Sequence, residues 1–413
     1  MKKLMQHPLF SGGLIMVGGS MLINVINYLY HLIIGRLLGP VDYGILASLF
    51  SILYIVGIIP SSASVAIVKF ISSCKNIKEV SLVYKSINRL IFTISLALSV
   101  LMILVSPVIS SFLHIDNIIL IMLISPILFF SLITLANQAT SQGLLKFMGY
   151  ILPSFISSIV KLLFGILFIT LGSSVFGAMG AIVLGAVFAY LISIPSIKEI
   201  ANRKLDTTKY DLKPFLKYSL PVLVQALAFT SIFTVDVILV KHYLSPFDAG
   251  IYAALSTLGK IIFFASSPVS SAMFPIVSNK SGRNESYLRI FVISFVATIL
   301  IGSGITFLYW LLPEFTIGVL YGKDYLSAKS ELVFMGVFVL FYSLSNFLLN
   351  FSLSISKTKI VFIPLVASIA QPILIYFYHK NISEIIKVSM FTTIVMFLSI
   401  SIFLIYNFAK PKT

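Results

Sequence analysis

Gly35-Arg-Leu-Leu-Gly-Pro-Val-Asp-Tyr-Gly44 is matched 206 positions later by Lys241-His-Tyr-Leu-Ser-Pro-Phe-Asp-Ala-Gly250. The ungapped match extends through Ser72 and Ser278 and contains twelve identical pairs, with Pro, Asp and Gly in register around one short loop. An internal repeat of this kind marks a duplicated structural unit. The sequence therefore predicts two halves with the same fold.

The composition places the chain in a lipid bilayer. Of its 413 residues, 59% are hydrophobic and 10% are charged, and the mean hydropathy of +1.07 exceeds that of soluble globular proteins. Charge-free stretches long enough to cross a hydrocarbon core of about 30 Å recur throughout. We therefore predict an all-α polytopic membrane protein with twelve transmembrane helices. The predicted spans cover residues 9–35, 44–70, 90–113, 118–138, 150–171, 175–196, 216–240, 250–276, 290–312, 332–355, 360–378 and 388–408.

Six predicted spans fall in each half, so both copies run in the same direction and are related by an axis along the membrane normal. We predict an N-terminal six-helix bundle over residues 1–200, a cytoplasmic linker over 201–215 and a C-terminal six-helix bundle over 216–413. Around the linker, Leu212, Phe215 and Leu216 lie among lysines. This pattern is compatible with a short interfacial helix or with a plain solvated linker.

The formal net charge of +16 is distributed unevenly. Most lysines and arginines fall in the loops that share a side with the N-terminus, which the positive-inside rule assigns to the cytoplasm. We therefore predict a multi-pass protein of the cell (cytoplasmic) membrane with both termini in the cytoplasm. The basic excess is expected to contact anionic membrane lipids and not nucleic acid.

Several classes of chemistry have no signal in the sequence. Cys74 is the only cysteine, which argues against a disulfide framework or a thiolate cluster. The five histidines are scattered, and no H-E-x-x-H, G-x-S-x-G or phosphate-loop motif occurs. The predicted loops leave no room for a catalytic domain outside the membrane. We therefore predict a protein that is not an enzyme and that uses no metal or cofactor.

Polar residues recur at helical spacing within the predicted spans. Such stripes either line a water-filled cavity or join helices by hydrogen bonds, and the pattern leaves both interpretations open. The first interpretation makes their polar side chains candidate ligands of a substrate. The stripes contain Asn24, Asn27 and His31 in the first span, Tyr54 in the second, Ser154 and Ser158 beside Lys161 in the fifth, and Asn346 and Asn350 in the tenth.

Charged residues within the spans are more discriminating, because a lone charge at the bilayer centre costs about 2.5–3.5 kcal/mol on insertion scales. Lys161 and Lys260 lie deep within the fifth and eighth spans. Asp236, the one acid in a predicted span, lies near its outer end, where Lys241 or Arg36 is the expected partner. A net positive interior favours a phosphate or diphosphate ligand. A structural Lys–Asp pair is the alternative.

The motif around Gly39-Pro40-Val41-Asp42-Tyr43-Gly44, and its second copy around Pro246-Phe247-Asp248-Ala249-Gly250, resembles the polysaccharide biosynthesis and export branch of the multidrug/oligosaccharidyl-lipid/polysaccharide (MOP) flippase superfamily. The resemblance covers essentially the full length. It implies two six-helix bundles around a cationic cavity that translocates polyprenyl-diphosphate-linked oligosaccharide repeat units by alternating access. By position, Arg36 matches the basic residue of the first motif and Asp236 the acid of the seventh span. The second copy departs from the first at Ser245.

We therefore predict a flippase for surface polysaccharide biosynthesis that moves its lipid-linked glycan from the inner to the outer leaflet. Glycan polymerase and glycosyltransferases of the same pathway are candidate partners. The candidate substrate-binding residues are Lys161, Lys260, Arg36, Asn24, Asn27, His31, Tyr54, Asn346 and Asn350, and the candidate coupling-ion residue is Asp236.

Two other functions are weighed against this one. A multidrug extrusion antiporter of the same superfamily would need intramembrane carboxylates to bind cations, and Asp236 alone is available. A membrane-embedded glycan polymerase would be expected to carry a sizeable outer loop with catalytic Arg or His residues, which the sequence lacks. The identity of the glycan and the energy source are not encoded in any recognisable pattern.

Overall fold

The computed structural model describes residues 8–203, 210–283, 285–355 and 357–409, and within these ranges every regular element is a helix. The α-helices are α2 (Pro8–Ser72), α3 (Ile77–Leu113), α4 (Ile118–Met122), α5 (Ile124–Gly143), α6 (Phe147–Thr170), α7 (Ser174–Asn202), α8 (Lys213–Ile232), α9 (Val235–Tyr243), α10 (Pro246–Gly282), α11 (Leu288–Leu311), α12 (Pro313–Leu320), α13 (Leu332–Ser354), α14 (Phe362–Phe377) and α15 (Ile382–Ala409). Two 3₁₀ helices, η1 (Lys323–Glu331) and η2 (Thr358–Val361), complete the list.

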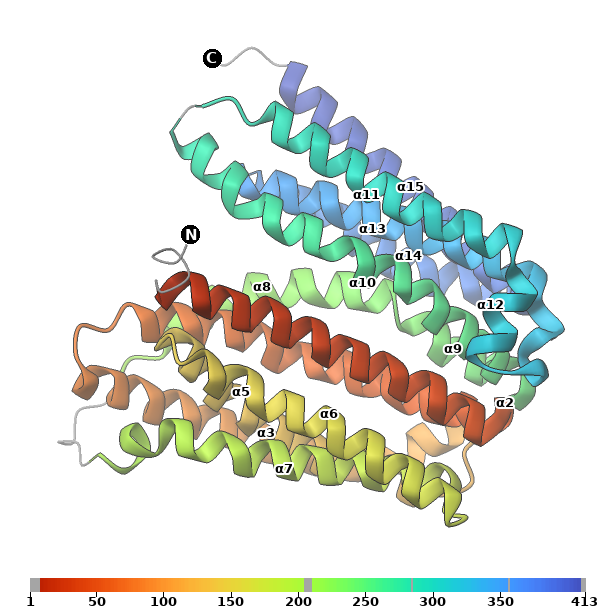
Figure 1. The fold of residues 1–413 in the computed structure, drawn as a ribbon, viewed down its shortest axis with the longest axis horizontal. Coiled ribbons are helices and arrows are strands. Elements are labelled where there is room, and N and C mark those ends of the chain that lie inside the picture. Colours follow the sequence, from red (N-terminus) through yellow and green to blue (C-terminus); the bar gives the residue numbers. More distant parts are fainter. Residues whose placement is uncertain (1–7, 204–209, 284, 356, 410–413) are drawn as a thin grey trace. The chain divides into compact units, whose positions relative to one another are not determined.

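The described residues contain 11 helical segments long and apolar enough to cross a membrane. The first segment lies in α2, whose 65 residues include a sharp turn at Gly39. There φ is 72° and ψ is 174°, a region that essentially only glycine occupies. The rings of Tyr30 and His31 contact that of Phe50, so the two arms of α2 pack side by side. Counting these arms separately gives the predicted number of spans (Figure 1).

The chain forms two compact units. Unit one contains the described residues of Met1–Leu38 and Leu49–Ala226, and unit two contains Gly39–Ser48 and the described residues of Leu227–Thr413. In unit one α7 packs on α5 and α6, and α3 packs on α5. In unit two α13 is central and contacts α10, α11 and α15 (Figure 1).

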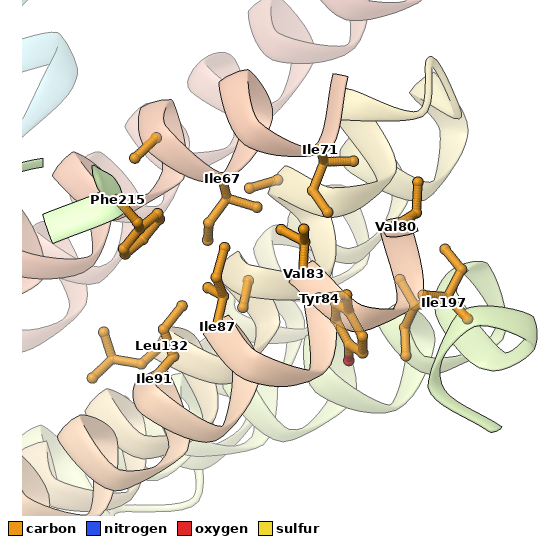
Figure 2. Packing of buried hydrophobic residues seen from close by; sticks show 14 residues of the cluster. Ile67, Ile71, Val80, Val83, Tyr84, Ile87, Ile91, Leu132, Ile197 and Phe215 are labelled. Atoms are coloured by element: carbon orange, nitrogen blue, oxygen red, sulfur yellow. The ribbon is translucent and has the colours of Figure 1, made fainter. Parts of the chain in front are cut away.

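Helix α3 begins thirteen residues before the predicted span at residue 90, because its first turns are amphipathic. Asn76 caps the helix by accepting the backbone N–H of Glu79 at 2.9 Å. Val80, Val83, Tyr84 and Ile87 then follow at helical spacing and enter a buried cluster with Ile67, Ile71, Leu132 and Ile197 (Figure 2). The predicted loop before residue 90 is therefore largely helical, with Lys78 and Lys85 beside the buried face.

Phe215 joins the same cluster and is 2% exposed. It lies in the first turn of α8, which begins at Lys213. Phe215 is therefore an apolar anchor in the core and not part of a solvated linker, while an interfacial helix at this point stays a prediction. Of the predicted linker 201–215, residues 204–209 lie outside the described residues, and the domain boundaries stay a prediction.

The seventh predicted span, residues 216–240, is interrupted. Helix α8 ends at Ile232 and α9 begins at Val235, with Thr234 at φ −139° and ψ −30°. Asp236 is thereby placed in the first turn of a new helix, where backbone N–H groups have no intrahelical partner. The sequence pattern predicted one continuous helix here.

Residues 39–48, the loop of the first repeat, pack within unit two. The hydroxyl of Tyr43 lies 3.1 Å from Thr257 Oγ1 on α10 and 3.1 Å from the hydroxyl of Tyr321, which follows α12. The rings of Tyr321 and Tyr325 lie beside that of Tyr43. The predicted outer segment Glu314–Glu331 is therefore ordered as α12 and η1 around a buried tyrosine cluster.

Candidate functional site

Lys161 projects from α6 toward the first arm of α2. Its Nζ donates a hydrogen bond to Asn27 Oδ1 at 2.8 Å and lies 4.5 Å from the centre of the Tyr30 ring. The Phe50 ring is 5.6 Å from the same ammonium. Gly165, one turn further along α6, permits this approach, because a Cβ atom there would lie 3.1 Å from the Tyr30 ring.

Aromatic side chains continue outward from this lysine. His31 contacts both Tyr30 and Phe50, with ring centres 5.7 and 4.8 Å apart, and Phe50 stacks on Tyr54 at 6.1 Å. Tyr54 is 46% exposed. The structure therefore gathers the predicted residues Lys161, Asn27, His31 and Tyr54 in unit one.

Among the described residues, the partners of Lys161 are an amide oxygen and two aromatic rings, all uncharged. No carboxylate contributes to its electrostatic environment within the described part of the chain. Cation–π contacts of about 0.5–2 kcal/mol stabilise an ammonium without cancelling its charge. The ammonium form of Lys161 is therefore not paired with a carboxylate in the described part of the chain and can attract an anion.

Lys260 on α10 lies over a second aromatic group, in unit two. Its Nζ is 4.9 Å from the centre of the Phe233 ring, at the break between α8 and α9. That ring stacks on Tyr342 of α13, with centres 4.7 Å apart and planes 5° from parallel. Asn346 follows Tyr342 by one turn and accepts a 3.2 Å hydrogen bond from Asn350. The predicted residues Asn346 and Asn350 therefore lie on α13, one and two turns after the Tyr342 ring that stacks on Phe233.

Asp236 is fully buried beside the same site. Its Oδ2 accepts a hydrogen bond from the Tyr252 hydroxyl at 2.7 Å, and its Oδ1 accepts the backbone N–H of Val237 at 2.9 Å. The cation that interacts electrostatically with Asp236 is Lys260. The break in the helix turns Asp236 toward Tyr252 of α10, and the expected pairing of this acid with Lys241 or Arg36 stays a prediction.

The buried network extends from Asp236 to α14 and α15. Ser389 interacts with the Tyr252 hydroxyl and accepts a 2.9 Å hydrogen bond from Gln371 Nε2. Gln371 Oε1 is buried and has no hydrogen-bond partner. Sequence reasoning missed Tyr252, Gln371 and Ser389. A lone amide within an apolar span was the signal for Gln371.

The two lysine sites occupy related faces of the duplicated halves. With the 206-residue offset of the repeat, Asn27 corresponds to Phe233 and Tyr30 to Asp236. Lys260 corresponds to Tyr54. In each half a lysine therefore lies beside equivalent residues of the first span. In the N-terminal half this lysine is Lys161 of the fifth span, and in the C-terminal half it is Lys260 of the second span.

Other predicted residues are not gathered in this way. Asn24 and Arg36 are exposed on the first arm of α2, one on each side of the Asn27–Tyr30 turn. Ser154 accepts a 2.7 Å hydrogen bond from Gln138 of α5, and Ser158 bonds to the backbone of its own helix. Ser154 therefore bonds to a neighbouring helix and Ser158 to a carbonyl of its own helix, as expected if the polar stripe joins helices and does not line a cavity.

Comparison with known families gives this geometry a context. Residues 8–330 match the family described as polysaccharide biosynthesis protein. The chain belongs to this family. A comparison with curated protein sequences returned no match.

The fold of this polysaccharide biosynthesis family member is that of the MOP superfamily. An inward-facing multidrug resistance MATE family transporter of that superfamily aligns over 91% of this chain and 94% of its own, with a TM-score of 0.74 and 14% identity. Lipid II flippase MurJ in an inward closed conformation aligns over 96% and 94%, with a TM-score of 0.70 and 18% identity. A MOP superfamily transporter from Pyrococcus furiosus aligns over 97% and 96%, with a TM-score of 0.62 and 15% identity. At these identities the similarity shows the fold alone.

Proposed function

We propose that the protein is a flippase that translocates polyprenyl-diphosphate-linked oligosaccharide repeat units from the inner to the outer leaflet of the cell membrane by alternating access. Membership of the polysaccharide biosynthesis family supports the pathway, and the MOP fold supports transport across a membrane. Lys161 is the observation that carries the substrate class, because its ammonium lies within a membrane-spanning helix and its partners among the described residues are uncharged.

In this proposal Lys161 in unit one and Lys260 in unit two are each a cationic ligand for diphosphate oxygens. Diphosphate oxygens are strong acceptors for charge-assisted hydrogen bonds, which are roughly twice as strong as neutral ones. Lys161, which donates to Asn27 Oδ1, can exchange that acceptor for a diphosphate oxygen of the substrate. Arg36, exposed near the turn at Gly39, is a further candidate for anionic groups.

The polar and aromatic residues around the two lysines suit the sugar part of the substrate. The side chains of Asn24, His31, Asn346 and Asn350 can donate and accept hydrogen bonds with sugar hydroxyls. The exposed face of Tyr54 can pack against the apolar face of a sugar ring. The polyprenyl tail stays in the bilayer, where no polar group of the protein is needed to solvate it.

Asp236 is the proposed coupling residue. Its carboxylate is buried next to the break at which α8 ends, and in many transporters the unwound carbonyls and helix C-terminal end at such a break coordinate the coupling ion. Proton or cation binding there would change the charge of a site that also contains Lys260.

The test is surface glycan production in a deletion strain that carries plasmid-borne variants. The Lys161→Ala/Lys260→Ala double variant should abolish surface glycan, while quantitative blotting of membranes shows wild-type amounts of protein. Lys146→Ala is the matched control, because this exposed lysine lies between α5 and α6 and its ammonium bonds the backbone carbonyl of Ser196 on α7. Normal glycan in the double variant would refute the assignment of both lysines.

The buried carboxylate of Asp236 also supports a second candidate, a cation-extruding antiporter. That function requires a drug-sensitive host to gain resistance when it expresses this protein, and Asp236→Asn to remove the resistance. Resistance without any effect on surface glycan would favour this candidate over the flippase.

A further inference from the structure

A groove lies between α14 and α15 in unit two, and it contains none of the residues of the proposed transport site. The two helices are neighbouring membrane spans (Figure 1). On their buried face Gln371 of α14 donates a 2.9 Å hydrogen bond to Ser389 of α15, which holds the pair in register. The groove has a volume of about 350 Å³ and opens on the exposed side of the pair.

The lining of the groove is almost entirely hydrocarbon. Its floor includes Ala367 and Met396, which are buried. Its walls include Phe362 of α14 and Phe391 of α15, which are exposed. Thr392 is a polar residue of the lining, and its hydroxyl donates a 2.9 Å hydrogen bond to a carbonyl of its own helix. The groove therefore suits an apolar occupant.

The bilayer decides what that occupant is. The exposed face of a membrane-spanning helix meets lipid chains and not water, so a lipid chain fills the groove and is held there by packing contacts. On α14 the lining extends from Phe362 to Leu374, twelve residues that rise about 18 Å. Half of a hydrocarbon core of about 30 Å is about 15 Å. The groove therefore matches the length of one chain in one leaflet.

Positive charge lies at one end of the groove. Phe362 is the first residue of α14, on the side that the positive-inside rule assigns to the cytoplasm. Lys359 lies three residues earlier in η2 and Lys357 directly before η2, and both lysines are exposed. Neither forms an ion pair within the described part of the chain. From residue 332 to residue 413 the one acid in the sequence is Glu384, in the first turn of α15 at the other end of the hairpin.

We propose that the groove and these two lysines form a binding site for an anionic phospholipid of the inner leaflet. One acyl chain lies between α14 and α15, and the phosphate lies at Lys357 and Lys359, where the headgroups of the cytoplasmic leaflet are found. A carrier polyprenyl chain is longer than one leaflet is thick and would extend past Leu374. The site is therefore assigned to a resident lipid and does not depend on what the protein transports.

The experiment photolabels the full-length protein in phosphatidylcholine nanodiscs. Two probes with a diazirine in the same acyl chain are compared at equal mole fraction, one a phosphatidylglycerol and the other a phosphatidylcholine, and the labelled peptides are mapped by mass spectrometry. Each lysine near the headgroup is expected to favour the anionic probe roughly fivefold. Residues 362–374 and 391–399 should therefore be labelled roughly twentyfold more by phosphatidylglycerol. Helix α11, which exposes Val296 and Leu300, should be labelled equally by both probes.

Variants separate the contribution of the headgroup from that of the chain. Lys357→Gln combined with Lys359→Gln should reduce labelling of the groove by phosphatidylglycerol to the level of phosphatidylcholine. Lys380→Gln, an exposed lysine at the other end of the hairpin, is the control and should change nothing.

Ala370→Phe places a ring in the groove and should reduce its labelling by both probes. Ile373→Phe is the matched control, because Ile373 is exposed on the same helix and does not line the groove.

A second measurement covers the case in which Ala370→Phe does not accumulate. Phosphatidylglycerol added to the detergent-purified protein should raise the thermal transition of wild type and leave that of the double lysine variant unchanged. Equal labelling of the groove by the two probes, or labelling no stronger than that of α11, would overturn the proposal. Displacement of the phosphatidylglycerol probe by undecaprenyl phosphate at lower concentration than by unlabelled phosphatidylglycerol would also overturn it, and would assign the groove to a polyprenyl chain.

Discussion

Gly44 and Gly250, which hold the same position in the two copies of the repeat, lie backbone against backbone. A Cβ atom on Gly44 would be 2.8 Å from the backbone nitrogen of Gly250, and one on Gly250 would overlap the carbonyl oxygen of Pro40 at 1.7 Å. Packing therefore explains the two repeated glycines: the backbones of the two loops are in contact at Gly44, Gly250 and Pro40, and neither glycine leaves room for a side chain.

Gly250→Ala should therefore destabilise the protein strongly. Overpacking typically costs 1–3 kcal/mol, roughly, where side chains can shift, and here the obstacle is a backbone carbonyl. The thermal transition of the purified protein, followed by loss of the monodisperse peak in size-exclusion chromatography, should fall by several degrees or the variant should not accumulate. Gly304→Ala is the control, because nothing lies within 4 Å of its Cβ position and alanine favours the helix. Equal stability of both variants would contradict the contact.

Tyr43→Phe tests the polar part of the same junction. The variant keeps the ring and removes a buried hydroxyl that lies within hydrogen-bond distance of Thr257 and Tyr321. The expected loss is about 1–3 kcal/mol, because a buried partner is left unsatisfied. Tyr321→Phe combined with Tyr43→Phe should cost less than the sum of the two single changes. Tyr376→Phe, an exposed tyrosine of α14, should leave the thermal transition unchanged.

The sequence predicted the features of the fold that depend on hydropathy and duplication. The charge-free segments correspond to the spans, and Gly39-Pro40 predicted the turn in α2. The early start of α3 was missed because Lys78, Lys85 and Arg89 mask the apolar spacing of Val80, Val83 and Ile87. The break at Phe233 and Thr234 was missed because neither residue is a helix breaker; packing against α10 and α13 decides it.

The sequence singled out members of the candidate site only where a charged residue or a regular polar stripe stands out from the apolar spans. Lys161, Lys260 and Asp236 are conspicuous in apolar spans, and Asn27 lies on a regular polar stripe. Tyr30, Phe50 and Phe233 are indistinguishable in sequence from other aromatic residues of a membrane protein, so their role as cation–π partners needed coordinates. The same holds for the choice of Lys260 as the cation beside Asp236, since spacing along the chain favoured Lys241.

Asn27→Asp should inactivate the proposed anion site without removing either lysine. The new carboxylate would lie at the position of the amide oxygen, 2.8 Å from Lys161 Nζ, and would compensate the lysine charge as an ion pair. Surface glycan should be lost while the protein remains in the membrane at normal amounts. Asn24→Asp, exposed one turn away on the same helix, should have a smaller effect. Full activity of Asn27→Asp would show that no anion binds at Lys161.

Cys74 should react slowly with alkylating agents, and its rate should keep rising with pH. Burial, followed by the charge of Glu79, raises the pKa of the thiol to about 11. Because the thiolate is the reactive form, its fraction near pH 7 is about a hundredfold below that of an ordinary cysteine. The rate of iodoacetamide modification should increase about tenfold per pH unit through pH 10. Glu79→Gln should accelerate the reaction at each pH, and a plateau near pH 9 would contradict the raised pKa.

The orientation in the membrane follows from the positive-inside rule and can be tested with two exposed positions. In a Cys74→Ser background, Lys380→Cys lies after α14 on the predicted outer side, and Lys198→Cys lies near the end of α7 on the predicted inner side. A membrane-impermeant maleimide should label Lys380→Cys in intact cells and Lys198→Cys only after the membrane is permeabilised. Both variants should label equally in detergent, which controls for thiol reactivity. Labelling in the opposite order would reverse the predicted topology, and with it the assignment of the inner leaflet as the side where the substrate enters.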